Sequence, residues 1–224
     1  MLRRLVASLL PLLVAAPLMA QTMVGIRAGL NRATFSAFVE EELLELENLG
    51  GATSEDPRMG AIAGIDVAFP LTSAVELRLG GAYAQKGYSL SLSGPGGSGF
   101  TGFEMDYLQF SALARVGSAR DGPVSVGVLL GPWMAYRVSC QLSVDFDLEE
   151  FGPIRESGSC SADGAKIDFG VAAGGGVELA VSDGLSLGLD LVYSLGLSRI
   201  DDDPDSPKNR SLAVQAGVVI PVGG

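Results

Sequence analysis

Residues 185–197 read LSLGLDLVYSLGL, and this stretch decides the fold because its two faces differ along its whole length. Every second residue is aliphatic or aromatic: Leu185, Leu187, Leu189, Leu191, Tyr193, Leu195 and Leu197. The residues between them are small, polar or charged, apart from one valine: Ser186, Gly188, Asp190, Val192, Ser194 and Gly196. Because successive side chains of a β-strand point to opposite faces, this pattern predicts a strand with one apolar face.

Eight segments, this one included, show the same alternation: roughly 23–35, 59–70, 75–91, 105–117, 124–139, 166–181, 185–200 and 211–222. Each is long enough for the about 9–11 residues that a tilted membrane strand needs. Three connections are short (70–74, 118–123 and 182–184), and four are long (36–58, 92–104, 140–165 and 201–210). The sequence therefore predicts an all-β protein, an eight-stranded antiparallel up-and-down transmembrane β-barrel. It has four long outer loops, three short periplasmic turns and both termini on the turn side.

The second face of each strand decides between a membrane barrel and a soluble one. A water-facing surface would carry Lys, Glu and Thr rather than glycine, which weakens strands. The lumen of an eight-stranded barrel is narrow and filled by side chains, so glycines there make room for large charged neighbours. We therefore expect the glycine-and-charge face to line the lumen and the aliphatic face to contact lipid.

Composition excludes several functions. The 224 residues are 47% hydrophobic and 18% charged, and no apolar run after residue 20 is long enough for a spanning helix. The net charge of −11 argues against nucleic-acid binding, which needs a basic surface. The chain contains no histidine, which excludes Ser-His catalysis and His-ligated metals. We predict no catalytic residues, no cofactor and no metal, and hence no enzyme.

The first twenty residues have the pattern of a secretory signal. Arg3 and Arg4 precede an apolar stretch broken by two prolines, which is too short for a membrane anchor. We expect cleavage after Ala20, with Ala16 as the alternative. The predicted division is a signal peptide at 1–20 and an outer-membrane barrel domain at 21–224.

Charged residues on the inward face are balanced in sign: Arg27, Arg78, Lys86, Arg115 and Arg137 against Asp66, Glu76, Asp168, Glu178 and Asp190. Balance favours a lumen filled by ion pairs over a selective pore, which would show one dominant sign. Arg137 ends one predicted strand and Asp168 opens the next. Because these two strands form a hairpin, we expect the charged atoms of the two side chains to lie within about 4 Å of each other. Five aromatic residues fall in phase with the apolar face near the long loops and predict an aromatic girdle: Tyr83, Phe110, Tyr136, Phe169 and Tyr193.

The long loops hold the remaining candidate sites. Cys140 and Cys160 are the only two cysteines, and in an exported protein they predict a disulfide that closes one loop. That loop is either a contact surface or a self-packed lid. Residues 38–49 form either a short amphipathic helix over the mouth or a solvated acidic loop. The acids of 201–205 suggest calcium, but their spacing is not that of an EF-hand, and a solvated turn is the preferred interpretation.

Several stretches, taken in order along the chain, resemble the PorT-like outer-membrane β-barrel family: 25–31, 83–87, 106–110, 131–133, 168–170 and 208–210. The resemblance implies an outer-membrane barrel; the founding member is linked to protein secretion, and the family supplies no catalytic residues. One departure concerns the last residues, 220–224, which lack the terminal aromatic residue that the assembly machinery reads in such barrels.

The preferred function is a non-enzymatic bacterial outer-membrane protein with a structural or surface-interaction role. The alternatives are a small-solute channel or an accessory of a secretion or transport system, and a soluble periplasmic ligand-binding barrel. The expected partners are membrane lipid, the barrel-assembly machinery during insertion, and an extracellular or secretion-system protein, with no nucleic acid.

Overall fold

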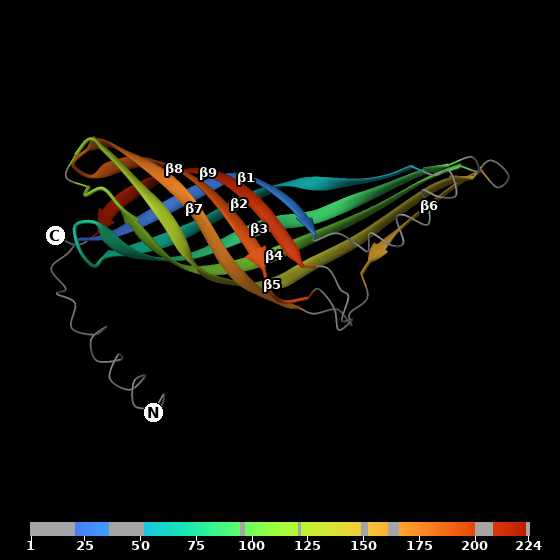
Figure 1. Cartoon of the computed structure of the whole chain (residues 1–224), viewed down its shortest axis with the longest axis horizontal. Helices are drawn as coiled ribbons and strands as arrows, with labels where there is room; N and C mark the ends of the chain where they lie inside the picture. Colours follow the sequence, from blue (N-terminus) through green and yellow to red (C-terminus); the bar gives the residue numbers. More distant parts are fainter. Residues whose placement is uncertain are drawn as a thin grey trace, which may run out of the picture.

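The computed structural model describes residues 21–35, 52–94, 97–120, 122–148, 152–160, 166–199 and 208–222. Nearly all of them belong to nine antiparallel strands (Figure 1). The strands are β1 (Thr22–Phe35), β2 (Ala52–Pro70), β3 (Val75–Gly94), β4 (Gly97–Gly117), β5 (Val124–Leu148), β6 (Gly152–Ser159), β7 (Ile167–Ser182), β8 (Leu185–Gly196) and β9 (Asn209–Val222). Among the described residues, no helix is long and apolar enough to cross a membrane.

Backbone pairing closes eight of these strands into a ring. The order around it is β4, β3, β2, β1, β9, β8, β7 and β5, and β4 pairs with β5 to complete the circle. Within the described part of the chain, β6 pairs only with β5 and lies outside the ring. The predicted eight-stranded up-and-down barrel is confirmed, and β6 is an additional strand.

The three short turns lie together at one end of the barrel. They join β2 to β3, β4 to β5, and β7 to β8. Figure 1 shows that β1 begins and β9 ends at this same end. In outer-membrane barrels the short turns face the periplasm, so this end is the periplasmic one.

At the other end the structure differs from the sequence prediction. Segments 92–104 and 140–165, expected to be loops, largely form strands, because β3 continues to Gly94, β4 starts at Gly97, and β5 runs to Leu148 before β6. β2 also begins at Ala52 instead of residue 59. Serine, glycine and aspartate are depleted in strands, which made these segments read as loops, but pairing with neighbouring strands overrides that preference. The extended strands project beyond the barrel as a long narrow sheet (Figure 1).

Burial confirms the orientation of the barrel wall. Ile26, Leu130 and Leu191 are 55%, 63% and 51% exposed, whereas Arg27 and Asp190 are 6% and 3% exposed. A soluble barrel would show the reverse arrangement, because exposing an aliphatic outer face to water costs free energy. The aliphatic stripe of each strand therefore contacts lipid, and the charged stripe faces the lumen.

A charge on the lipid face tests this orientation. Leu191→Arg, halfway along β8, should lower the free energy of unfolding by about 2–4 kcal/mol in lipid vesicles, since arginine is most costly at the bilayer midplane. Val222→Arg, at the last residue of β9, should cost only about 0–1 kcal/mol because it lies near the interface. Urea titrations of the refolded variants measure both values, and equal costs would contradict the assignment.

The signal peptide, the helix expected within residues 38–49 and the acidic turn at 201–205 lie outside the described residues.

Candidate functional site

A network of buried ion pairs fills the part of the lumen next to the short periplasmic turns. Arg78 lies at its centre, with Nη1 at 2.7 Å from Asp190 Oδ2 and Nη2 at 3.2 Å from Glu178 Oε1 and 3.3 Å from Glu76 Oε1. Arg27 Nε lies 2.7 Å from Asp66 Oδ1. We call Arg27, Arg78, Arg120, Asp66, Glu76, Glu178 and Asp190 the ion network. Its pairs cross the lumen between strands, so they join the walls of the barrel to one another.

Arg120 belongs to this network although it lies in the short turn between β4 and β5 and was not identified from the sequence. Its Nη2 lies 2.8 Å from Glu76 Oε2, and its Nη1 lies 2.5 Å from Glu178 Oε2. A cation in a short periplasmic turn normally faces water, and the sequence gives no signal that this one folds inward. The two glutamates each accept bonds from more than one guanidinium as a result.

Glycines provide the space for these side chains, as the sequence predicted. A Cβ on Gly127 would lie 2.8 Å from Arg115 Nε and 2.9 Å from its Cζ, so the guanidinium lies flat against the bare backbone of β5. A Cβ on Gly25 would lie 2.7 Å from Asp66 Oδ1. Real Cβ atoms do not approach neighbours this closely, so a side chain at either glycine would force the charged neighbour to move. The glycines on the lumen face therefore leave the space that the side chains of the ion network and of Arg115 occupy.

Arg115 is buried at the edge of the network but makes no ion pair in the described structure. It is 3% exposed, and its Nη2 donates a hydrogen bond of 2.5 Å to the hydroxyl of Ser125. The sequence placed Arg115 among the lumen ion pairs, and the structure pairs it with a hydroxyl in place of a carboxylate. Arg115 therefore keeps hydrogen-bond donors that no carboxylate of the described residues uses.

An apolar layer crosses the lumen above the ion network. It consists of Leu113, Leu129, Trp133, Ala172 and Val192, which are between 1% and 9% exposed and pack in one cluster. The sequence analysis described the lumen as glycine and ion pairs, so this layer corrects it. Between the two layers lies a small cavity of about 70 Å³, lined in part by Gln109, Ser111 and Gln215.

Lys86 lies above the apolar layer among aromatic rings. Its Nζ is 4.3 Å from the centre of the Trp133 ring and 5.3 Å from that of Tyr107, and it has no hydrogen-bond partner among the described residues. Asp168 attracts this ammonium electrostatically, and it accepts hydrogen bonds from Ser198 Oγ and from Asn209 Nδ2, the latter at 3.1 Å. Lys86, at 1% exposed, is thus held by cation–π contacts, which are strongest where water is excluded, and by the attraction of Asp168.

The expected pair between Arg137 and Asp168 stays a prediction. Asp168 pairs in register with Ala135, so Arg137 lies two residues further along β5 on the same face of the barrel. The hairpin register that the sequence assumed is therefore present, and both side chains belong to the lumen face.

The five aromatic residues expected in a girdle are all exposed on the outside of the barrel: Tyr83 39%, Phe110 54%, Tyr136 47%, Phe169 52% and Tyr193 44%. Phe110 and Phe169 each pair with Met134, from opposite sides. Their outward orientation is that required of a girdle at the interface between lipid and water, and the girdle itself stays a prediction.

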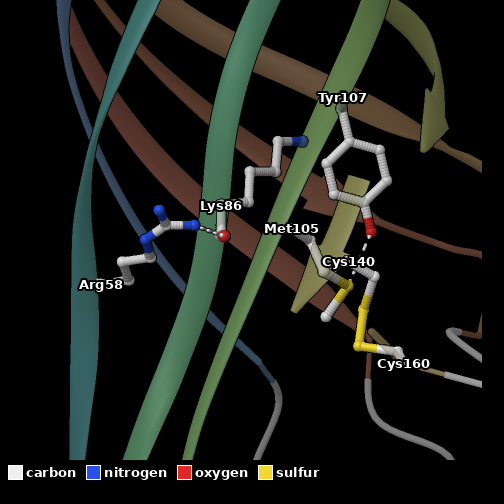
Figure 2. Close-up of a disulfide and its surroundings, with 6 residues drawn as sticks. All are labelled: Arg58, Lys86, Met105, Tyr107, Cys140 and Cys160. Carbon is white, nitrogen blue, oxygen red and sulfur yellow. Dashed lines mark hydrogen bonds between the residues drawn. A yellow bond between two sulfur atoms is a disulfide. The ribbon is translucent and has the colours of Figure 1, made fainter. Parts of the chain in front are cut away.

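The disulfide predicted between Cys140 and Cys160 is present, with a Cα–Cα distance of 5.4 Å. It joins the end of the barrel portion of β5 to the residue after β6, and it closes the β5–β6 hairpin. Figure 2 shows the disulfide beside Met105, whose Sδ accepts a hydrogen bond of 3.3 Å from the hydroxyl of Tyr107. Cys140 packs against the cluster that contains the apolar layer, so the hairpin is anchored to the top of the lumen.

Reduction of this disulfide should loosen the hairpin and leave the barrel closed. A closed loop of this size stabilises by about 3 kcal/mol, and the ring itself closes through β4, β5 and β7 without β6. We expect trypsin to cut after Arg155, on β6, at least about tenfold faster once the protein is reduced. Cleavage after Arg199, outside the hairpin, provides the control. An unchanged rate at Arg155 would show that the bond does not restrain β6.

The strands beyond the barrel form what we call the outer sheet: residues 52–57, 85–94, 97–106, 139–148 and 152–159. The pairing register extends the lumen face of the barrel onto one side of it, since Lys86 pairs with Met105 and Met105 with Cys140. That side is mainly apolar and carries Leu90, Leu92, Phe103, Leu142, Val144, Phe146 and Ile154, together with Thr101 and Glu156. The other side is mainly polar and carries Ser89, Ser91, Ser93, Ser98, Gln141, Ser143, Asp145, Asp147 and Arg155, together with Phe100.

The geometry offers no site for a metal within the described residues, where no cluster of three or more potential ligands occurs. The carboxylates of the ion network are each bonded by arginine, which leaves them committed to structural pairs.

Comparison with known proteins identifies the family. A model of the outer membrane protein beta-barrel domain matches residues 19–202. Neisserial surface protein A, a solved structure, is 18% identical with a TM-score of 0.46, covering 91% of this chain and 98% of that one. OprG from Pseudomonas aeruginosa is 10% identical with a TM-score of 0.41, covering 92% and 97%. Ail, the attachment invasion locus protein of Yersinia pestis, is 14% identical with a TM-score of 0.39, covering 90% and 100%.

No curated protein matches the chain. The family model covers most of the sequence, and its description agrees with the closed ring and the lipid-facing wall found here. The chain therefore belongs to the outer membrane protein beta-barrel domain family and is a protein of the bacterial outer membrane.

Proposed function

We propose that this protein is a non-enzymatic outer-membrane barrel that acts through its outer sheet, as a surface-interaction protein. The observation that carries the proposal is the sheet itself. Its strands are continuous with the barrel wall, and it presents an apolar and a polar face beyond the barrel. An amphipathic sheet held rigidly above a membrane is suited to contact another macromolecule. The PorT-like resemblance and a link to secretion are part of this proposal.

The filled lumen supports a structural role for the barrel more than a channel. A solute would have to cross both the ion network and the apolar layer, and the cavity between them is only about 70 Å³. A selective pore would also present one sign of charge, whereas the network pairs both. The absence of histidine from the sequence argues against hydrolase chemistry as well.

Single-channel recording in planar bilayers tests the closed lumen. We expect no conductance steps from the refolded wild-type protein. The variant Trp133→Ala with Leu129→Ala thins only the apolar layer and should stay silent as well, because the ion network still fills the lumen. Its heat-modifiable gel mobility shows whether it folds. Regular conductance steps from the wild type would favour the channel, which is the second candidate.

Site-specific cross-linking on intact cells tests the role of the outer sheet. A photo-reactive residue at Phe146 on the apolar side of the sheet should give discrete protein adducts. The same group at Leu191, on the lipid face, is the control and should give none of these adducts. If the two positions give the same products, the sheet is not an interaction surface.

Export and insertion complete the proposal. We expect cleavage of the signal after Ala20, so sequencing of the mature N-terminus should start at Gln21, or at Pro17 if cleavage follows Ala16. The barrel-assembly machinery is the expected partner during insertion.

A further inference from the structure

A cavity of about 850 Å³ opens at the periplasmic end of the barrel. The short turns form its rim, through residues such as Thr72, Ser73 and Ala119. Its floor is the lower surface of the ion network, where Glu76, Arg115, Arg120 and Glu178 lie. We call it the periplasmic vestibule. Its size falls in the range of sites that enclose a small organic ligand.

The charges of the floor are not equally satisfied. Glu76 is paired with Arg78 and Arg120, and Glu178 is paired with Arg27 as well as these two. Arg115 has only the hydroxyl of Ser125 as a hydrogen-bond partner, although it is 3% exposed. A guanidinium presents five N–H donors, so most of those of Arg115 remain available.

Arg120 also lines the vestibule, but its donors are not available to a ligand. Its Nη1 and Nη2 are bonded to Glu178 and Glu76, and its Nε is buried away from the cavity surface. The guanidinium that can meet a ligand is therefore that of Arg115, and a carboxylate can bind such a group through two parallel hydrogen bonds.

The walls indicate what the carboxylate is attached to. Apolar side chains, including Val75, Val181, Leu185 and Val219, line the vestibule together with the polar rim. A simple inorganic or acetate-sized anion would leave most of this volume and apolar surface unused. A chain of two or three residues with mixed polar and apolar groups fits both the size and the character of the walls.

We propose that the periplasmic vestibule binds the free C-terminal carboxylate of a short peptide, with Arg115 as the residue that recognises it. This function lies on the opposite side of the membrane from the outer sheet and does not depend on the function proposed above. Gly127 is part of the site, because it lets the Arg115 side chain lie along β5 toward the cavity.

Calorimetric titration of the refolded full-length protein in detergent tests the proposal with three probes: trialanine, trialanine C-terminal amide and acetate. We expect trialanine to bind, and the amide to bind about 10-fold to 100-fold more weakly, as for loss of a charge-assisted hydrogen bond. Arg115→Gln should weaken trialanine binding by a similar factor. Arg155→Gln, which removes a cation from β6 outside the vestibule, is the matched control and should bind as the wild type does.

Each result decides the proposal. Equal binding of trialanine and its amide would overturn it, and this comparison needs no variant, so it holds even if Arg115→Gln does not fold. Undiminished trialanine binding by a folded Arg115→Gln protein would also overturn it. Acetate binding as tightly as trialanine would identify a simple anion site and overturn the assignment of a peptide.

Discussion

Arg78→Met should lower the free energy of unfolding by about 3–5 kcal/mol, the cost of breaking a buried ion pair by removing one partner. Arg78 is 5% exposed and contacts Glu76, Glu178 and Asp190 within 3.3 Å. Its loss leaves two guanidiniums facing four carboxylates in the ion network, and these carboxylates are only 3% to 7% exposed. Urea unfolding in lipid vesicles, followed by gel mobility without heating, measures the change.

Arg155 provides the matched control for this variant. Its pair with Asp145 has a similar separation, 2.8 Å, but the two side chains are 78% and 40% exposed. Exposed pairs contribute about 0–1 kcal/mol, so Arg155→Met should change the free energy of unfolding little. A loss at Arg155 as large as that at Arg78 would mean that the network has no special role in stability.

Lys86→Met should have the opposite effect and stabilise the barrel, by about 1–3 kcal/mol. The ammonium of Lys86 is buried with no hydrogen-bond partner among the described residues, whereas methionine keeps the length of the side chain beside Trp133 and Tyr107. The lost cation–π contacts and the lost attraction of Asp168 offset only part of the several kcal/mol that desolvation of an ammonium costs. Asp168 keeps its bonds to Ser198 and Asn209.

The same urea titration measures this variant, with Lys86→Gln as its companion. Glutamine removes the charge but keeps a polar group in the apolar surroundings, so it should stabilise less than methionine. A clear loss of stability in Lys86→Met would show that the lysine is held by interactions stronger than ring contacts.

The barrel was predictable from the sequence because it follows from local alternation. Leu191 and Asp190 sit on opposite faces of one strand, and the glycine stripe in phase with Asp190 identifies the lumen before any contact is known. The alternation also indicated the apolar layer, because Trp133 and Leu129 fall at the alternate positions of β5 that point inward. Small, polar or charged residues dominate the inward face of the other strands, and for that reason the apolar layer was not predicted.

The partners within the lumen were not predictable in the same way. The sequence paired Arg137 with Asp168 because neighbouring strands are easy to align, and that pair stays a prediction. The contacts of the ion network cross the lumen, as between Arg78 and Asp190, 112 residues apart. Such pairs depend on the stagger of every strand around the ring, which local patterns do not specify. The inward turn of Arg120 depends on the same geometry.

The ion network also bears on the order of events during assembly. Arg27 is on β1, Glu178 is on β7 and Asp190 is on β8, so these groups meet only after the first and last strands have joined. In an open, half-formed sheet the same charges remain hydrated and gain nothing from one another. The free energy gained when these charges pair therefore stabilises only the state in which β1 and β9 have joined. Closure of this barrel is for that reason a late and cooperative event.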